Sequence, residues 1–375
     1  MLLAAYALRA KEGFVFVRQD CPLALARVEK AIAAARGYGL LGDHVLGTEM
    51  AFSLSVRRAA GGFLSGEATA VVASMSGRVG EPAPKYVRQA EEGFRGRPTV
   101  VNNAETWANV PLIVSKGAAW FSAVGTPGSP GTKVLTISGP VRHAGVAEVP
   151  FGTTLAGVVD LAGGMLRGKT LKAFQTGGPS GGILPAALAG TRYDYEELAA
   201  AGTIVGNGNV AVMDRRTCMA DTARALARTL CEESCGKCSS CREGLYVMHA
   251  VLGRLCEGKG QKGDLEQLDD LAAALAETSL CQYGKTAANP FRSVLSHFRE
   301  ELAAHLERRC PAGICKALVA YSINDRCNGC TVCALKCPVK AIAGNRKERH
   351  HIDPAVCIRC GICYDVCKFD AVEVK

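Results

Sequence analysis

The first third of the chain alternates between short apolar runs and amphipathic segments. Residues 13–18 (GFVFVR) are rich in aromatic and β-branched side chains, which predicts a buried strand. Residues 22–36 carry apolar side chains at helical spacing and predict an amphipathic helix. Residues 52–57 alternate between apolar and polar positions, so we expect a second strand with one buried face. The pattern of this region is typical of an α/β fold.

A glycine-rich turn and a pair of asparagines follow in the same region. Residues 61–72 (GGFLSGEATAVV) predict a turn that enters a helix, and such a turn lets backbone N–H groups approach a phosphate. Glycine turns are also common before helices that bind no ligand. Asn102 and Asn103 come after an expected strand, with Glu105 close by, and their side-chain amides can hydrogen-bond a flavin or its ribityl chain. The pattern favours a nucleotide site without establishing one.

The segment from about 127 to 212 changes to strand patterns separated by glycine-rich turns. The predicted elements are strands at 133–138 and 141–149, a helix at 154–162, and a strand with a glycine loop at 174–183. The first two strands are expected to pair through a turn at Gly145, and residues 193–197 predict a solvated helix start. This order is consistent with a small β-grasp domain, to which we assign a scaffolding role.

Residues 213–320 are predicted to form a helical bundle that carries a cluster of cysteines. The segment contains a C-x2-C-x2-C run and, about forty residues later, one further cysteine. Three thiolates on one loop and one from a distant loop fit a [4Fe-4S] cluster. They fit a zinc site less well, because zinc sites seldom use three cysteines so tightly spaced. The residues assigned to this cluster are Cys235, Cys238, Cys241 and Cys281.

The last segment, residues 321–375, carries the pattern C-x2-C-x2-C-x3-C twice. This is the pattern of a ferredoxin with two [4Fe-4S] clusters, in which each run supplies three thiolates to one cluster and its fourth to the other. A zinc site or a set of disulfides is the alternative, but zinc sites use two C-x2-C pairs rather than a duplicated run of four. We assign Cys327, Cys330, Cys333 and Cys367 to one cluster, and Cys357, Cys360, Cys363 and Cys337 to the other.

A further group of soft ligands lies near the end of the bundle. The group consists of Cys256, His305, Cys310 and Cys315. Three cysteines and one histidine are a standard closed, tetrahedral zinc set, which would connect the bundle to the ferredoxin segment. Free cysteines with a surface histidine remain the alternative. Cys21, Cys218 and Cys231 have no partners at ligand spacing and are interpreted as buried thiols.

Composition and charge narrow the class of protein. The chain has 375 residues, 48% of them hydrophobic, which is ample for several cores. No apolar run reaches the roughly 18 residues of a membrane span, and the N-terminal stretch lacks the features of a signal peptide. Eighteen cysteines in metal-binding spacings favour a reducing, cytoplasmic compartment. The formal charge of +9 falls to about +3 once three clusters of about −2 each are counted, so it does not indicate nucleic-acid binding.

Two stretches carry a resemblance to a known family. Residues 63–85 (FLSGEATAVVASMSGRVGEPAPK), followed by residues 97–111 (RPTVVNNAETWANVP), resemble the flavin- and NADH-binding subunit of respiratory complex I. They resemble equally the β subunit of NAD-linked and electron-bifurcating iron hydrogenases and of formate dehydrogenases. The resemblance extends from residue 1 to about residue 320, and the ferredoxin segment is an addition seen in hydrogenase-type members.

The resemblance implies a multidomain α/β plus α+β organisation. The implied domains are a partial FMN- and NADH-binding domain at 1–126, a β-grasp (SLBB-like) domain at 127–212, a helical bundle with a [4Fe-4S] cluster at 213–320, and a two-[4Fe-4S] ferredoxin domain at 321–375. In such a chain the three clusters are accompanied by FMN, NAD(H) and, at the Cys/His group, zinc.

The resemblance also assigns cofactor contacts, and here this chain departs from the family. The implied contacts with flavin or nucleotide are Gly66, Glu67, Lys85, Asn102 and Asn103. Ala68 stands where the family has a second glutamate, and Arg88 follows Lys85 where an aromatic residue is expected. The family's N-terminal FMN-binding glycine loop lies upstream of this sequence. A longer chain, a partner polypeptide, or loss of the flavin site would each account for this difference.

These features together predict an electron-transfer protein. Clusters carry single electrons, and a flavin converts a hydride into two such electrons. We therefore expect an iron–sulfur subunit of an NAD(P)H-linked oxidoreductase complex, hydrogenase- or complex I-like. The alternative is a flavin-free adaptor that relays electrons between other subunits.

The expected partners follow from the same resemblance. It implies a thioredoxin-like [2Fe-2S] subunit and a hydrogenase or dehydrogenase catalytic subunit. The basic turn at 346–351 is interpreted as a solvated face, with docking of a soluble ferredoxin as the alternative. No nucleophile triad or carboxylate pair points to hydrolytic chemistry.

Overall fold

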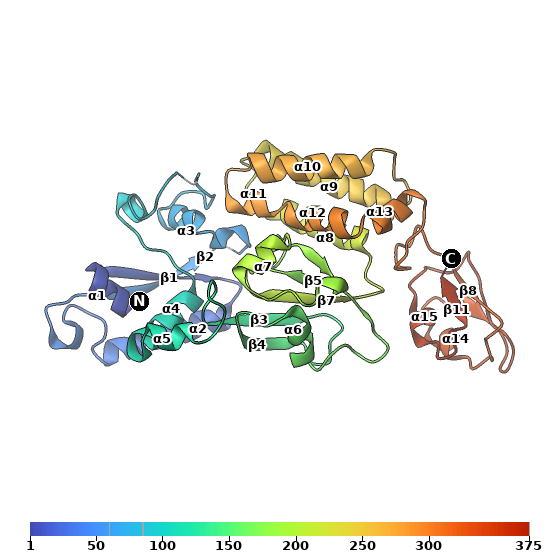
Figure 1. The fold of residues 1–375 in the computed structure, drawn as a ribbon, viewed down its shortest axis with the longest axis horizontal. Coiled ribbons are helices and arrows are strands. Elements are labelled where there is room, and N and C mark those ends of the chain that lie inside the picture. The colour runs from blue at the N-terminus through green and yellow to red at the C-terminus, as the bar shows by residue number, and fades with distance from the viewer. Residues whose placement is uncertain (60, 85, 375) are drawn as a thin grey trace. The chain divides into compact units, whose positions relative to one another are not determined.

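The computed structural model describes residues 1–59, 61–84 and 86–374 (Figure 1). The chain forms two compact units. The first contains residues 1–124 together with the short segments 233–237 and 280–283, and the second contains the remainder. Within the described residues, no helix combines the length and the apolar character that crossing a membrane requires.

The first unit is built on a β–α–β element. Strands β1 (Glu12–Arg18) and β2 (Ser53–Ala59) pair in parallel, with Glu12 opposite Ser53, and α2 (Pro22–Gly37) connects them. Proline at the first helical position suits α2, since its missing N–H has no partner there in any helix. Helix α1 (Leu2–Leu8) completes a small core whose buried members are Ala5, Ile32, Leu41, Val45 and Phe52. The predicted strands and helix are present.

The remainder of the first unit is made of short turns and helices. Short 3-10 turns occur at Val45–Gly47, Leu64–Gly66 and Phe94–Gly96, and the helices are α3 (Ala68–Met75), α4 (Ala104–Lys116) and α5 (Ala118–Ser122). The strand expected before Asn102 is not there, because residues 97–103 follow an irregular path. Pro98 cannot donate to a β-ladder, and Thr99 instead bonds locally, its N–H reaching the Gln89 carbonyl at 2.8 Å.

The second unit contains a five-stranded mixed sheet in the order β4-β3-β7-β5-β6. The strands are β3 (Thr132–Ser138), β4 (Gly145–Pro150), β5 (Leu171–Thr176), β6 (Ile183–Pro185) and β7 (Asn209–Asp214). β3 and β7 are parallel and the other pairs are antiparallel. Helices α6 (Leu155–Leu161) and α7 (Tyr195–Ala200) and a 3-10 turn at Ala186–Leu188 accompany the sheet.

Two details of this sheet region differ from the sequence expectation. The strand expected over 141–149 begins only at Gly145, so the connection from β3 runs through residues 139–144. Residues 193–197 do lead into a helix, α7, whose first residues Tyr195 and Glu196 are exposed, but the two residues before it are buried. Tyr193 is fully buried and donates its hydroxyl proton to the Val205 carbonyl at 2.9 Å. Asp194 is 2% exposed and caps α7 by accepting from the Glu197 N–H.

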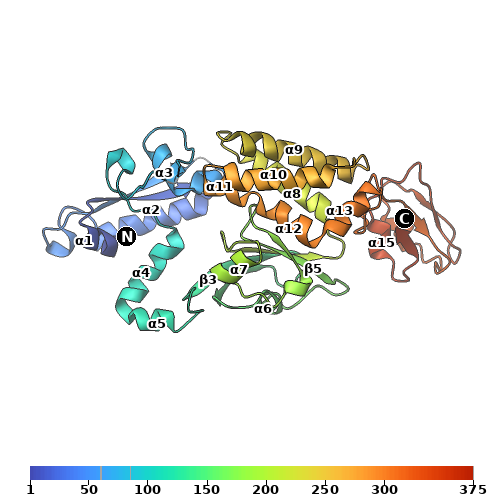
Figure 2. The ribbon, with the colours of Figure 1, turned by 45° about the horizontal axis from the view of Figure 1, so that its top comes forward.

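A helical bundle lies along one side of this sheet (Figure 2). Its helices are α8 (Met219–Glu232), α9 (Ser239–Cys256), α10 (Asp264–Thr278), α11 (Gln282–Thr286), α12 (Asn289–His297) and α13 (Arg299–Leu306). α12 is joined to the sheet edge by a buried hydrogen bond from the Ile183 N–H to the Ser293 hydroxyl at 2.8 Å. The large buried side chains Leu230, Leu245 and Phe291 show that the bundle has a core of its own.

The last segment consists of two interlocked repeats. Its elements are β8 (Tyr321–Ile323), α14 (Val332–Lys336), β9 (Ile342–Ala343), β10 (His351–Ile352), α15 (Ile362–Val366) and β11 (Val372–Val374). β8 of the first repeat pairs with β11 of the second, and β9 of the first pairs with β10 of the second. Each repeat therefore brings its last cysteine next to the other repeat's loop.

Candidate metal and cofactor sites

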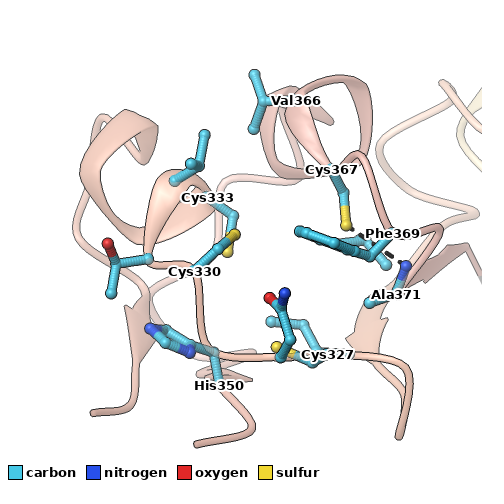
Figure 3. A pocket seen from close by; sticks show the side chains of 13 residues that line it. Cys327, Cys330, Cys333, His350, Val366, Cys367, Phe369 and Ala371 are labelled. Atoms are coloured by element: carbon cyan, nitrogen blue, oxygen red, sulfur yellow. Dashed lines mark hydrogen bonds between the residues drawn. The ribbon is translucent and has the colours of Figure 1, made fainter. Parts of the chain in front are cut away.

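The two cysteine runs of the last segment surround two separate cavities. Figure 3 shows the first cavity, with the sulfur-bearing side chains of Cys327, Cys330, Cys333 and Cys367 around it. The first three come from the loop before α14 and from α14 itself, and Cys367 follows α15 of the other repeat. The second cavity is lined in the same way by Cys337, Cys357, Cys360 and Cys363. These are the groupings of four that the spacing predicted.

The donor chemistry of both cavities fits iron–sulfur clusters. Backbone N–H groups already point at the sulfurs, with Ala341 N 3.2 Å from Cys337 Sγ and Arg359 N 3.4 Å from Cys357 Sγ. Such N–H···S contacts favour the thiolate form that iron requires. Burial raises the pKa of Cys363 to about 11 in the metal-free chain, so cluster formation must displace its proton.

A third, buried group combines one histidine with three cysteines. The ligand atoms of Cys218, His305, Cys310 and Cys315 all lie within 4.8 Å of one another. The Cys218 Sγ is 3.3 Å from His305 Nε2 and 3.6 Å from the Cys315 Sγ. Hydrogen bonds from Cys218 and Cys315 hold the pKa of Cys310 below its usual range. Its donor set is that of a closed zinc site.

The composition of this group differs from the sequence expectation in one member. Cys256 was expected as the fourth ligand, and Cys218 was interpreted as a thiol without a partner. Cys218 precedes α8 and is 87 residues from His305, so spacing contained no signal for it. Cys256, at the end of α9, is buried beside the group. The pKa of Cys315 is raised because hydrogen bonds with Cys256 and Cys310 outweigh the lowering effect of Cys218.

The remaining two unassigned cysteines are not fully buried, contrary to expectation: Cys21 is exposed and Cys231 is half-buried.

The histidine of the group is held in one orientation by the bundle. Its Nδ1 lies 2.7 Å from the Glu301 backbone carbonyl, which can only accept a hydrogen bond, so Nδ1 is the donor there and Nε2 is the nitrogen that faces the cysteines. The Glu301 carboxylate in turn accepts from the Met219 N–H at 2.9 Å and pairs with Lys172 at 2.7 Å. This network links α13 to the start of α8, where Cys218 lies.

The cysteines assigned to the bundle cluster are divided between the two units. In the second unit, Cys238 is the N-cap residue of α9, and Cys241 is buried in its first turn. Cys235 and Cys281 belong to the short segments 233–237 and 280–283 of the first unit.

Within the first unit, the glycine-rich turn is bound by a carboxylate of its own chain. The N–H of Phe63 donates to Glu233 at 2.5 Å. Glu67 accepts from the N–H groups of Thr69 and Ala70, each at 2.9 Å, and so caps α3. The N–H groups of Phe63, Thr69 and Ala70, which lie in the segment expected to approach a phosphate, are therefore occupied by these two side chains.

The other expected flavin contacts have varied surroundings. Gly66 is exposed at the end of a 3-10 turn. Asn103 caps α4, accepting from the Glu105 N–H at 2.9 Å, and Asn102 beside it is exposed. Lys85 lies outside the described residues.

Comparison with protein-family models matches three parts of the chain. Residues 1–112 match the Nuo51 FMN-binding domain, and residues 221–305 match the NADH-ubiquinone oxidoreductase-F iron-sulfur binding region. Residues 350–373 match a 4Fe-4S binding domain. These matches fall on the β–α–β unit, the bundle and the second ferredoxin repeat.

Whole-chain comparison decides the family. NADP-reducing hydrogenase subunit HndC of Solidesulfovibrio fructosivorans is 43% identical, over 99% of this chain and 76% of that protein. The F 2 subunit of NADH-quinone oxidoreductase in Rhizobium meliloti (strain 1021) is 41% identical, over 83% of this chain and 74% of that protein. The chain belongs to the family of NADH-quinone oxidoreductase F subunits. The resemblance carried by residues 63–85 and 97–111 is thereby confirmed.

A solved structure of this family has the same fold over most of the chain. An NAD+-reducing [NiFe]-hydrogenase, crystallised in the H2-reduced state, superposes with a TM-score of 0.73 and 34% identity. The match covers 82% of this chain but only 51% of the solved chain. This chain therefore spans about half the length of that hydrogenase chain.

Proposed function

We propose that this chain is an iron–sulfur electron-transfer subunit of an NAD(P)H-linked oxidoreductase complex, hydrogenase- or complex I-like. The observation that carries the proposal is the pair of cavities in the last segment, each lined by four cysteines drawn from both repeats. Two clusters this close in sequence and structure suit stepwise transfer of single electrons. Membership of the NADH-quinone oxidoreductase family supplies the link to nicotinamide nucleotides.

Three sets of cysteines hold the clusters in this proposal. The ligand sets are Cys327, Cys330, Cys333 and Cys367; Cys337, Cys357, Cys360 and Cys363; and Cys235, Cys238, Cys241 and Cys281. The third set rests on the sequence pattern and on the iron–sulfur family match over 221–305. When bound, each cluster stores and releases one electron. The protein's part is to supply deprotonated sulfurs and to direct backbone N–H groups at them.

Zinc is proposed at the Cys218, His305, Cys310 and Cys315 group. A closed set of four protein ligands leaves no position for a substrate, so its role is structural. The site joins the start of α8, the end of α13 and the loop that leads to the ferredoxin domain. We also propose a scaffolding role for the five-stranded sheet as a β-grasp domain, with domain boundaries near residues 126, 212 and 320.

FMN and NAD(H) are proposed for the complete nucleotide-binding domain. The match of residues 1–112 to an FMN-binding domain supports this, and Gly66, Lys85 and Asn102 are the proposed contacts. Glu67 and Asn103 are proposed with them, although each also caps a helix. One observation favours the flavin-free adaptor. The carboxylates of Glu233 and Glu67 accept hydrogen bonds from N–H groups of the glycine turn and of the start of α3.

The partners in this proposal are the other redox subunits of a cytoplasmic complex. They include a thioredoxin-like [2Fe-2S] subunit and a hydrogenase or dehydrogenase catalytic subunit, with a soluble ferredoxin as a further electron carrier. The names of the relatives support this class of assembly, since they are subunits of a hydrogenase and of NADH-quinone oxidoreductases.

The test is a metal and flavin analysis of anaerobically purified protein. We expect about twelve Fe and one Zn per chain, from three cubane clusters and one zinc site. About one FMN with reduction of the clusters by NADH supports the electron-transfer subunit with its own flavin. The same iron without flavin supports the adaptor. Iron well below about eight, with abundant zinc, contradicts both.

A further inference from the structure

A histidine lies in the wall of the first ferredoxin cavity, where sequence patterns indicated only a solvated basic turn. His350 is 1% exposed, although its neighbours 346–349 and His351 are exposed. Its ring lines the same cavity as Cys327, Cys330, Cys333 and Cys367 (Figure 3). The expectation of a solvated face is therefore wrong at this residue.

The two ring nitrogens of His350 have different surroundings. Nδ1 lies 3.1 Å from the Glu348 backbone carbonyl. Nε2 is buried and has no hydrogen-bond partner among the residues that the structure describes. A buried polar atom left without a partner costs about 1–3 kcal/mol, so native proteins rarely keep one. The unpartnered atom therefore points to a ligand in the cavity.

The ring is held in place by close packing. Gly344 has a φ of +153°, and a Cβ at that position would lie only 2.8 Å from the His350 Cγ. The neighbouring Arg349 donates to the Ile323 carbonyl and pairs with Asp325, which ties the turn to β8. The backbone on both sides of the ring is thus fixed, and the imidazole cannot turn away from the cavity without disturbing it.

The rest of the cavity offers few other polar contacts. Apart from the four cysteines, its lining is mostly apolar, with Asn328 and Thr331 as the other polar side chains. Asn328 is exposed and Thr331 is half-buried, so His350 is the buried one. In the second cavity the corresponding polar side chain is Tyr321, and its hydroxyl already donates to the Gly313 carbonyl at 2.9 Å.

We propose that His350 donates a hydrogen bond from Nε2 to the [4Fe-4S] cluster held by Cys327, Cys330, Cys333 and Cys367, and thereby raises the reduction potential of that cluster. The inference rests on the proposed assignment of those four ligands. The sulfurs of a cluster can only accept a hydrogen bond, so an N–H at the buried, unpartnered Nε2 is the contact that they favour. A hydrogen-bond donor at the cluster stabilises the reduced, more negative state. His350 is a positioning and tuning residue rather than a ligand.

The experiment compares His350→Phe and His350→Gln with His351→Phe in the full chain. Phenylalanine at position 350 keeps an aromatic ring and removes the hydrogen-bond donor, whereas glutamine keeps an N–H donor. His351 is an exposed neighbour, and its variant serves as the control. Redox titration followed by electron paramagnetic resonance measures each cluster. We expect His350→Phe to favour the oxidised form of one cluster by about tenfold, which is 59 mV for one electron, with the other clusters unchanged. The His351→Phe potentials should equal those of the wild type.

A second measurement needs no variant. Wild-type protein labelled with 15N-histidine should show a nitrogen coupling, and an exchangeable proton coupling, to one reduced cluster in pulsed electron–nuclear double resonance. Absence of both couplings overturns the inference, as do unchanged potentials in an iron-replete His350→Phe variant. Failure of the wild type to bind iron at the last segment overturns the proposed function instead, so the two failures are distinguishable.

Discussion

The buried Cys/His group makes the sharpest prediction, because sequence and structure name different fourth ligands. The structure places the Cys218 Sγ 3.3 Å from His305 Nε2, within the group of four. Cys256 was expected from spacing and lies beside the group instead. Cys218→Ser and Cys256→Ser are therefore matched variants, since each replaces one buried thiol by a hydroxyl of similar size.

The expected loss of zinc affinity in Cys218→Ser is large because the site is closed to water. Cys218 and His305 are 1% and 0% exposed, so water has little access with which to replace a missing ligand. Changing an outer-shell partner of a metal site already costs about 10–100-fold in affinity. Loss of a direct ligand should cost at least about a hundredfold, or about 2.7 kcal/mol. Cys256→Ser should change zinc affinity by less than about tenfold, the lower end of outer-shell effects.

Chelator competition with zinc measured by mass spectrometry provides the assay. Wild type and Cys256→Ser should both retain about one zinc per chain after dialysis against a moderate chelator, and Cys218→Ser should lose it. The zinc-depleted variant should also be cleaved faster within 307–320, the loop that carries Cys310 and Cys315. Zinc retained in Cys218→Ser but lost in Cys256→Ser would refute the structural grouping, and absence of zinc from the wild type would show that this site does not hold zinc.

Further predictions concern the clusters, the sheet and pH. Cys333→Ser should lose about four of the expected iron atoms, whereas Cys21→Ser, at an exposed cysteine outside every set, should lose none; iron analysis decides between them. Leu135→Ala, at a fully buried position of the sheet, should destabilise by about 2–5 kcal/mol in denaturant unfolding, and Val146→Ala, 72% exposed, by under about 0.5 kcal/mol. Tyr193→Phe should cost about 1 kcal/mol in the same assay, because the Val205 carbonyl loses its buried donor. Zinc retention should fall as the pH is lowered, since protons compete for the thiolates; retention that rises at low pH would contradict thiolate ligation.

The sequence was most informative where cysteines are closely spaced along the chain. In each C-x2-C-x2-C run three sulfurs share one loop, so their proximity is a local property of the backbone, and the grouping into two sets of four could be predicted without a structure. The same holds for the β–α–β element at 12–59, where the period of apolar residues changes from strand to helix and back. Family membership was also readable, from residues 63–85 and 97–111.

Only the tertiary structure could decide which residues from distant segments meet. Cys218 meets His305 across 87 residues because α8 and α13 pack together, and no local pattern encodes that contact. His350 is buried because β9 and β10 pair and carry the turn over the cavity, whereas its sequence neighbourhood is basic and polar. The amino-acid sequence by itself determined which loops can hold clusters, since ligand spacing is a short-range property. The fold decided the fourth member of the Cys/His group and the burial of the His350 imidazole, since packing between distant elements is what brings these side chains to their places.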